Sequence, residues 1–367
     1  MDFEFSAEQD QLRDSVRRFL TDRVPIAYVR GHYDDDHVGA DGPWAGLVDL
    51  GVVGLLAPIA YGGAGMGMVD AGVVLEELGR ALYPGPFAAS AVGAVSLIDA
   101  LDAWDADPSL PAVARGDQIG TVALVEPGRR AHWDTPSTTA APDGSRWRLQ
   151  GTKVHVPDGR AADVLLVVGS VGEELAVFRV DAASAEIVAT PTVDGSRKEA
   201  TVVFDGTLGD RLDGGDATEA VAATVDRLGV AAVVDGVGAA QRALELSVEY
   251  ARERRQFGAP IGSFQAVQHL CADMLRAVEL SRAAAYYACW AADAADAAER
   301  HRAATMAVAF ASDELAMVGA STIQVHGGIG FTWEHDAHLF YKRLLTLQRT
   351  GGGSVDQLAE LASILLD

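Results

Sequence analysis

The sequence predicts a mainly α-helical protein with a central β domain, and three observations carry this prediction. Helical patterns of apolar residues occupy the first hundred residues and return beyond Thr218. Between them, from about Gly120, short apolar runs alternate with clusters of Gly, Asp and Pro, as strands and turns do. The chain has 367 residues and is 49% hydrophobic, which is enough for two or three packed domains. We expect a helical domain at residues 1–119, a β domain at 120–212 and a helical bundle at 213–367.

The N-terminal part begins with a predicted helix. Ser6 and Gln9 have the spacing of a capping box, in which each side chain satisfies a backbone N–H group at the start of the helix. Apolar residues then recur at i, i+4, i+7 and i+8, which places them on one face: Leu12, Val16, Phe19 and Leu20. A second helix is predicted over residues 69–82. It ends where Tyr83-Pro84-Gly85-Pro86 prevents its continuation.

The central segment is predicted to form short strands. Four apolar runs of strand length lie between turn-forming clusters: residues 121–125, 164–168, 175–180 and 201–204. Around residues 147–156 apolar and polar side chains alternate, as they do in a strand with one buried face. These patterns indicate a small all-β domain.

The C-terminal part is rich in alanine and is predicted to form long helices. Three segments have the required length: Asp226–Arg255, Gln265–His301 and Ala303–Val325. Breaks are expected at Gly258-Ala259-Pro260 and at the glycine-rich run of residues 327–330. Several long helices in succession predict a helical bundle.

Composition excludes several classes of function. The chain has 29 Lys and Arg residues against 52 Asp and Glu residues, and its net charge of −23 opposes binding to nucleic acid or to an anionic membrane. Prolines interrupt the apolar stretches at residues 50–69 and 81–98, so we expect no membrane-spanning helix. The two cysteines form no disulfide framework, and no histidine cluster has metal-ligand spacing. We therefore expect a cytoplasmic protein without a bound metal.

Two motifs could carry chemistry. The run Gln324-Val325-His326-Gly327-Gly328-Ile329-Gly330 lies between two predicted helices, and its glycines would let backbone N–H groups approach a phosphate. The alternative is a glycine-rich helix terminator. Arg254 and Gln265 lie at a corner between two predicted helices, where a guanidinium and an amide could hold an anion. The alternative for Arg254 is a favourable interaction with the dipole of the helix that it ends.

Several segments together resemble one protein family. They are Val237–Leu244, Tyr250–Gly258, Gln265–Met274 and Gln324–Gly330 with Glu334, and, in the same order along the chain, Glu76–Arg80, Glu126–Gly128 and Gly151–Lys153. Over most of its length the chain resembles the acyl-CoA dehydrogenase family, in particular its actinobacterial members. The resemblance implies an N-terminal helical domain, a middle β-barrel and a C-terminal four-helix bundle.

The resemblance also implies an activity, a cofactor and partners. Members of the family remove two hydrogens from an acyl-CoA: a carboxylate takes the α proton, and FAD accepts a hydride from the β carbon. The implied partners are the acyl-CoA substrate, a separate electron acceptor, and further subunits arranged as a homo- or hetero-oligomer such as a dimer of dimers. Seven residues match the family's contacts to the ADP part of FAD, which are given largely to a neighbouring subunit: Arg254, Phe257, Gln265, Gln324, Gly327, Gly328 and Gly330.

The chain departs from the family at the catalytic base. The usual glutamate near the C-terminus corresponds to Gly351 or Gly352, and the alternative base position of some members corresponds to Leu228. Asp235 lies seven residues after Leu228 on the same predicted helix, and it could act as the base if burial raised its pKa. Otherwise Asp235 is a helix acid that pairs with a neighbouring subunit or faces solvent.

The flavin side of the β domain departs as well. The run from Val125 to Asp134 lacks the hydroxyl groups that the family places there, and His155-Val156-Pro157 replaces its Trp-Ile-Thr. Contacts given to a neighbour's cofactor are therefore kept, whereas the chain's own flavin pocket is changed. Three hypotheses remain: an active FAD-dependent acyl-CoA dehydrogenase, a non-catalytic partner that completes the FAD site of a Glu-bearing dehydrogenase, and a flavin monooxygenase on the same scaffold.

Overall fold

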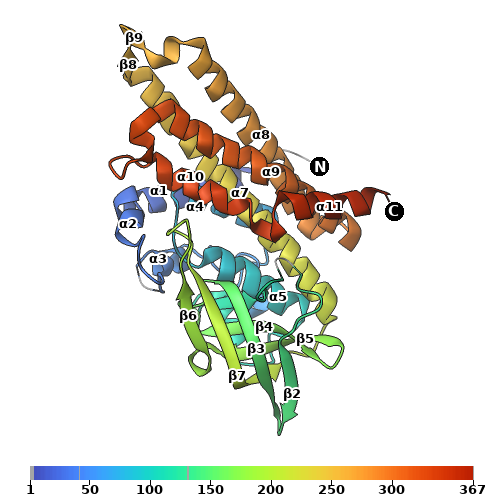
Figure 1. Ribbon diagram of the computed structural model, residues 1–367. Helices are drawn as coiled ribbons and strands as arrows, with labels where there is room; N and C mark the ends of the chain where they lie inside the picture. The colour runs from blue at the N-terminus through green and yellow to red at the C-terminus, as the bar shows by residue number, and fades with distance from the viewer. Residues whose placement is uncertain (1–3, 41, 130–131, 367) are drawn as a thin grey trace. The chain divides into compact units, whose positions relative to one another are not determined.

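The computed structural model describes residues 4–40, 42–129 and 132–366, and its helices and strands are labelled in Figure 1. The chain forms two compact units. The helical unit consists of Met1–Arg30, Gly72–Tyr83 and Gly229–Asp367, and the barrel unit consists of Gly31–Ala71 and Pro84–Leu228. The segment expected to be an N-terminal helical domain contributes to both units.

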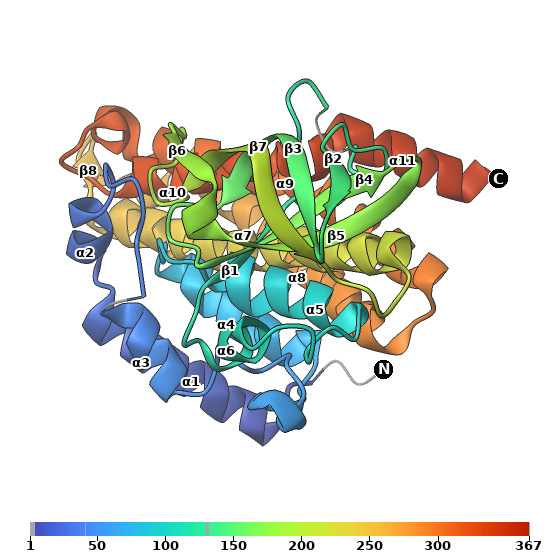
Figure 2. The ribbon, with the colours of Figure 1, turned by 90° about the horizontal axis from the view of Figure 1, so that it is seen from below.

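All strands of the barrel unit lie in the segment that was predicted to be β. They are β1 (Gly120–Ala123), β2 (Thr139–Asp143), β3 (Arg146–Pro157), β4 (Val164–Val171), β5 (Glu174–Asp181), β6 (Glu186–Thr190) and β7 (Glu199–Arg211). The pairings of five strands close into a ring, in which β4 pairs with β2 and β5, β3 with β2 and β7, and β7 with β5. Figure 2 shows β3, β7 and β5 side by side. This closed order confirms the expected middle β-barrel.

The position of strand β4 between two cores explains why its sequence is continuously apolar. Leu165 and Val167 belong to the core inside the barrel, whereas Val164, Leu166 and Val168 belong to a second core that includes α5 (Val95–Ala100) and α6 (Ser109–Arg115). A strand buried on both faces has no polar side to alternate with. The π-helical segment Ala88–Ala94 precedes α5, and α3 (Pro43–Asp49) lies earlier in the same unit.

Two strands were missed by the sequence prediction. β2 has the sequence TAAPD and β6 has the sequence EIVAT, and most of their residues are exposed or only half-buried. Each pairs with a long neighbour, β3 or β7, so the pairing rather than an apolar pattern stabilises them.

The helical unit contains the long helices predicted from the C-terminal sequence. Its helices are α1 (Ala7–Arg23), α8 (Gln265–Ala294), α9 (Ala297–His326), α10 (Ala337–Leu347) and α11 (Ser354–Leu366), together with parts of α2 (Ile26–Gly31), α4 (Met68–Arg80) and α7 (Ala217–Glu253). The capping box of α1 is confirmed, because Ser6 accepts from the N–H group of Gln9 and the Gln9 side chain accepts from that of Ser6.

The boundary between α8 and α9 lies at residues 295–296, whereas the two predicted helical segments were Gln265–His301 and Ala303–Val325. Asp296 is the N-cap of α9, and its carboxylate accepts a hydrogen bond from the N–H group of Glu299 at 2.9 Å. This local bond starts the new helix without any glycine or proline, which is why the break was misplaced. Among the described residues, one helical stretch, Ala297–Phe331, is long and apolar enough to cross a membrane, but 61% of its apolar window is buried, as in the central helix of a bundle.

Helices α4 and α7 cross at backbone contact. A Cβ atom on Gly79 would lie 1.9 Å from the carbonyl oxygen of Asp235, and one on Gly238 would lie 1.8 Å from that of Glu76. No side chain fits at these distances, so both positions require glycine. The two glycines allow the helix backbones to approach each other directly.

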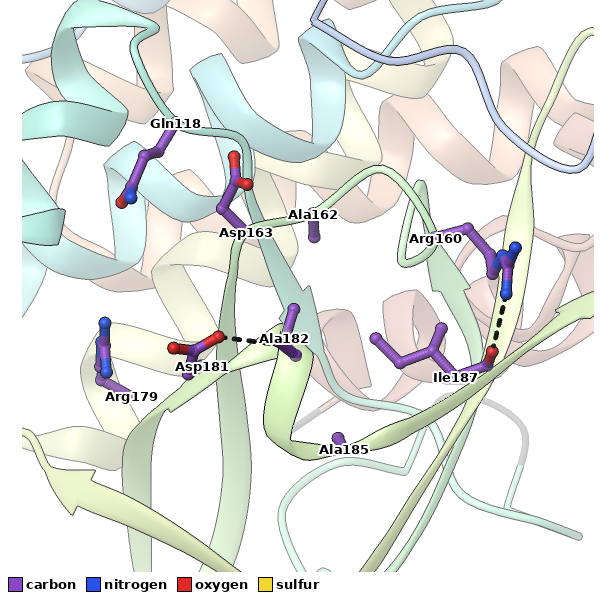
Figure 3. Close-up of a pocket in the computed structure, with 10 residues that line it drawn as sticks. Gln118, Arg160, Ala162, Asp163, Arg179, Asp181, Ala182, Ala185 and Ile187 are labelled. Atoms are coloured by element: carbon purple, nitrogen blue, oxygen red, sulfur yellow. Dashed lines mark hydrogen bonds between the residues drawn. The ribbon is translucent and has the colours of Figure 1, made fainter.

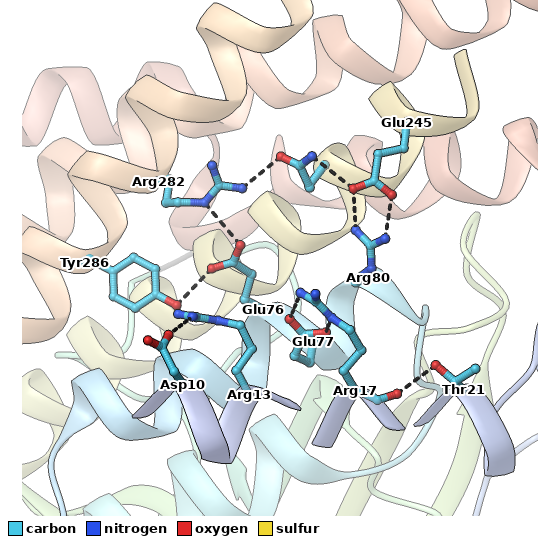
Figure 4. A network of polar contacts seen from close by, with 11 residues as sticks. Asp10, Arg13, Arg17, Thr21, Glu76, Glu77, Arg80, Glu245, Arg282 and Tyr286 are labelled. Atoms are coloured by element: carbon cyan, nitrogen blue, oxygen red, sulfur yellow. Dashed lines mark hydrogen bonds and ion pairs between the residues drawn. The ribbon is translucent and has the colours of Figure 1, made fainter. Parts of the chain in front are cut away.

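Ion pairs surround this crossing, as Figure 4 shows. Arg17 of α1 donates two hydrogen bonds to the buried carboxylate of Glu77, at 2.8 and 2.6 Å. Arg80 forms a bidentate pair with Glu245 of α7. Burial alone would raise the pKa of Glu245, but hydrogen bonds from Arg80 and Gln241 outweigh it and lower that pKa to about 2.

The same crossing is joined to α8. Arg282 donates to Glu76 at 3.1 Å and to Gln241 at 3.0 Å, and the hydroxyl of Tyr286 donates to Glu76 at 2.9 Å. Helices α1, α4, α7 and α8 therefore share one polar network around the two glycines.

Candidate functional site

The corner after α7 projects an aromatic side chain. Strands β8 (Arg255–Gln256) and β9 (Ala259–Pro260) form a two-residue hairpin, in which Phe257 and Gly258 have φ values of +51° and +79°. Positive φ at both tip residues is typical of the tight hairpin turn that matches strand twist. Phe257 is 94% exposed, and its ring meets only the edge of Phe264 within the described chain. This exposure leaves the ring of Phe257 available for contact with another molecule.

Two polar side chains flank this hairpin without a partner. Arg254 directly follows α7 and Gln265 begins α8; both are exposed, and neither side chain bonds to any described residue. The N-cap of α8 is Phe264, which offers no side-chain acceptor, so the first N–H groups of this 30-residue helix remain open. A helix N-terminus with open N–H groups beside a guanidinium attracts an anion.

The glycine run forms the end of α9 and a short turn. Gly327 caps the helix with a φ of +64°, and Gly330 is buried, where an added Cβ would lie only 3.0 Å from the Cβ of His326. Gly328 has neither constraint: its φ is not positive, and a Cβ there would meet nothing within 4 Å. The chain itself does not require glycine at Gly328, which suits close approach of a ligand to the backbone.

Stacked rings join the two motifs. Tyr250 of α7 stacks on His326 at the end of α9, with 4.6 Å between ring centroids, and His335 packs against His326 at 4.3 Å. His326 donates from Nδ1 to the carbonyl of Thr322 at 2.8 Å, while its buried Nε2 bonds to no described residue. Burial lowers the pKa of His326, so this ring is neutral near pH 7. Through these rings the last turns of α7 contact the end of α9, so the corner and the glycine turn lie at one end of the bundle.

The residues at this end suit the ADP part of a dinucleotide such as FAD. They supply a guanidinium from Arg254, amides from Gln265 and Gln324, the backbone of the exposed Gly328, and an aromatic plane at Phe257. The N–H of Gly327 is already used, because it donates to the carbonyl of Ile323. Pyrophosphate needs the charge and the N–H donors, and a purine needs the plane. The side chains of Arg254, Phe257, Gln265 and Gln324 are all exposed, so within this chain they line an open surface and not an enclosed pocket.

No carboxylate side chain occupies the family's base positions. Gly351 and Gly352 have φ values of +59° and +89° in the turn Thr350–Gly352, so the backbone itself favours glycine there. At the alternative position, Leu228 packs against Gly93, with 3.0 Å from its Cδ2 to a Cβ placed on that glycine. The nearest carboxylate to Gly352 that the structure gives is that of Asp356, in the first turn of α11, whose Oδ2 lies 2.5 Å from a Cβ placed on Gly352.

Asp235 is not solvated, and its partner lies in the same chain. Its carboxylate is buried and accepts hydrogen bonds from Nη1 of Arg343 at 3.0 and 3.1 Å, while Nη2 of Arg343 donates to the carbonyl of Tyr83 at 3.3 Å. Both expectations for a non-catalytic Asp235 are therefore wrong, because α10 supplies the counter-ion. A role of Asp235 as base would require this buried ion pair to open, so the geometry favours a structural role.

A second buried ion pair lies in the barrel unit. Glu126 accepts from Nζ of Lys153 at 2.9 Å and from the N–H groups of Ser137 and Thr138 at 2.6 and 2.8 Å. Burial alone would raise the pKa of Glu126, but these bonds and the Lys153 charge outweigh it and lower that pKa to about 2. The Glu126 carboxylate thus holds Ser137 and Thr138 beside it and joins the two ends of the intervening loop. This loop stands where the family has its hydroxyl-bearing segment.

The barrel unit also has a shallow polar hollow of about 430 Å³ (Figure 3). Its charged side chains are engaged locally: Arg160 donates to a backbone carbonyl at 3.3 Å, and Asp163 and Asp181 accept from backbone N–H groups at 2.8 and 3.0 Å. None of the predicted site residues lines it. Within the described ranges, no three His, Cys, Asp or Glu side chains are grouped to hold a metal.

Comparisons with known proteins give the family of the chain. The family models "Acyl-CoA dehydrogenase, N-terminal domain" and "Acyl-CoA dehydrogenase, C-terminal domain" match residues 6–117 and 217–365. The acyl-CoA dehydrogenase IpdE2 of Mycobacterium tuberculosis is 33% identical over 337 residues, which are 92% of this chain and 90% of that protein.

Two solved structures are similar over their whole length. A chain of the steroid ACAD Tcur3481–Tcur3483 is 30% identical with a TM-score of 0.88, and the match covers 98% of each chain. A chain of the ChsE4–ChsE5 complex from Mycobacterium tuberculosis is 27% identical with a TM-score of 0.86, and the match covers 100% of this chain and 99% of that one.

The structural role of Asp235 can be tested by substitution. Asp235→Asn leaves the buried guanidinium of Arg343 without a counter-ion and should lower the free energy of unfolding by about 3–5 kcal/mol, measured by denaturant titration. Combining Asp235→Leu with Arg343→Met should recover most of the loss, because both charges are then removed. A folded, equally stable Asp235→Asn protein that has lost turnover would contradict this assignment.

Acid should destabilise the helical unit through His338. Burial, together with the charges of Lys342 and Arg30, lowers the pKa of His338 from 6.5 to about 4. As the pH falls, His338 is therefore protonated in the unfolded chain before it is protonated in the folded chain. The free energy of unfolding keeps its full contribution from His338 above about pH 6.5 and falls by at most about 3 kcal/mol as the pH drops toward 4. His338→Phe should flatten this part of the curve of unfolding free energy against pH. Identical slopes in both proteins would show that His338 does not contribute.

Proposed function

The chain belongs to the acyl-CoA dehydrogenase family, and from this premise we propose that it is one subunit of a heteromeric, FAD-dependent acyl-CoA dehydrogenase. In this assembly its corner and glycine turn complete the FAD site of a partner subunit that carries the catalytic glutamate. One observation carries the proposal. The side-chain donors for the ADP part, Arg254, Gln265 and Gln324, are exposed and have no partner among the described residues, whereas glycine and leucine occupy the base positions.

The proposed division of labour follows from the chemistry. When bound, FAD accepts the hydride from the β carbon of the acyl-CoA. Arg254 would offset the pyrophosphate charge, Gln265 and Gln324 would donate to its oxygens or to the ribose, and Phe257 would cover an apolar face of the cofactor. Removal of the α proton needs a positioned carboxylate, and we assign it to the partner subunit.

Similar proteins support a paired assembly and a substrate class. Tcur3481–Tcur3483 and ChsE4–ChsE5 are each named as two different chains, and the former is described as a steroid ACAD. We propose that this chain likewise pairs with a second dehydrogenase chain, as a dimer of dimers, and that the substrate is a CoA thioester with a bulky, ring-bearing acyl group. The proposal includes a cytoplasmic location and a separate electron acceptor.

A second candidate function rests on Asp356. Its carboxylate lies beside Gly352, where the family's base would begin, so the chain could be a complete dehydrogenase with aspartate as its base. Under this alternative, the chain alone should bind FAD, show a flavin spectrum and bleach with an acyl-CoA. Asp356→Asn should then lower kcat at least a hundredfold without releasing FAD. A colourless purified chain, or unchanged turnover of Asp356→Asn, would exclude this candidate.

Loss of Arg254 should weaken cofactor binding in the assembly. In the assembly with the proposed partner chain, Arg254→Ala should raise the dissociation constant for FAD at least tenfold, because the variant lacks the positive charge that would face the pyrophosphate. Arg252→Ala is a matched control. Arg252 is likewise exposed and lies two residues before Arg254, in the last turn of α7. Flavin fluorescence after gel filtration measures the retained FAD. Equal retention by both variants would mean that Arg254 does not contact the cofactor.

A further inference from the structure

Arg30 forms hydrogen bonds to the segment that follows the glycine turn. Arg30, from α2, donates from Nε and Nη2 to Oδ1 of Asp336 at 2.8 and 2.7 Å. It also donates from Nη1 to the carbonyl of Trp333 at 3.0 Å and from Nη2 to that of His335 at 3.0 Å. All three nitrogens of one guanidinium therefore bind the four-residue stretch 333–336.

His335 connects this anchor to the glycine turn. While its carbonyl accepts from Arg30, its ring packs against His326 at 4.3 Å and meets the edge of Tyr250 at 6.2 Å. His326 is the last residue of α9 and precedes Gly327 directly. The turn Gly327–Phe331 thus runs between two fixed ends: the buried ring of His326 before it and the residues held by Arg30 after it.

The first two residues of the turn lack side-chain packing. Gly327 and Gly328 are exposed, and a Cβ at either position would meet nothing within 4 Å, so the bond from the N–H of Gly327 to the carbonyl of Ile323 is what holds this end within the turn. Glycine backbone is the most mobile kind, and ordering it when a ligand binds reduces the affinity. A guanidinium that holds the adjoining segment removes part of this entropy loss before binding.

We propose that Arg30 is a positioning residue for the dinucleotide-binding turn: it preorganises the backbone at Gly328, whose N–H would face the cofactor, without touching the cofactor itself. The inference deepens the proposed function and rests on it. It also assigns a role to the N-terminal segment, which lies about three hundred residues away in sequence from the turn.

Variants of Arg30 test the proposal in the FAD-retaining assembly. Arg30→Gln should raise the dissociation constant for FAD about tenfold, and Arg30→Lys, which keeps the charge but loses the fork of donors, should fall between that variant and the wild type. Hydrogen exchange at residues 327–336 should accelerate in Arg30→Gln even before FAD is added. This second readout does not depend on turnover.

Arg17→Gln is the matched control. Arg17 also comes from the N-terminal segment and forms a bidentate pair, with the buried carboxylate of Glu77, but its bonds go to α4 (Figure 4). Its loss should destabilise the fold at least as much and leave the FAD dissociation constant and the exchange of residues 327–336 unchanged. If Arg30→Gln does not fold, Arg30→Lys is judged by the same two readouts.

The outcomes separate this inference from the function on which it rests. A wild-type assembly that retains no FAD defeats the proposed function. If the wild type retains FAD and the Arg30 variants bind it equally well, or if Arg17→Gln weakens binding to the same extent, the positioning role of Arg30 is overturned while the proposed function stands.

Discussion

The backbone contact between α4 and α7 is the constraint on which the helical unit depends. Gly79 and Gly238 permit it, and charged pairs on both sides stabilise it through Glu77 and Glu245. Arg343 closes it from α10 by binding both Asp235 and the carbonyl of Tyr83. These pairs are buried or half-buried, so breaking their hydrogen bonds is costly, and they fix the orientation of α4, α7 and α10 relative to one another.

That direction determines where the candidate site can form. From Gly238, α7 continues for about 24 Å to Arg254, and Tyr250 in its last turns contacts the end of α9 through His326. The corner at Arg254 and the glycine turn are therefore brought together by helix packing and not by their own loops. This arrangement does not depend on the base positions, so changes at Leu228, Gly351 and Gly352 leave it intact.

Local signals in the sequence predicted local features, and contacts across the chain could not be predicted. The Ser6 cap, the apolar strands and the glycine turn depend on neighbours within a few residues. The pairing of Asp235 with Arg343 joins residues 108 positions apart, and no pattern in either helix indicates it. The family resemblance identifies candidate cofactor-binding residues, but it does not indicate the hydrogen bonds from Arg30 to residues 333–336, because those come from a different helix.

The two glycines at the helix crossing also affect how related sequences should be interpreted. Each faces a carbonyl of the opposite helix, so no smaller residue on the other side can make room for a side chain. Neither glycine can therefore be replaced while the fold is kept, whether by a single substitution or together with a second substitution on the opposite helix. Invariance at Gly79 and Gly238 in an alignment would report steric exclusion, and it would be no indication of catalytic activity in the chains that share it.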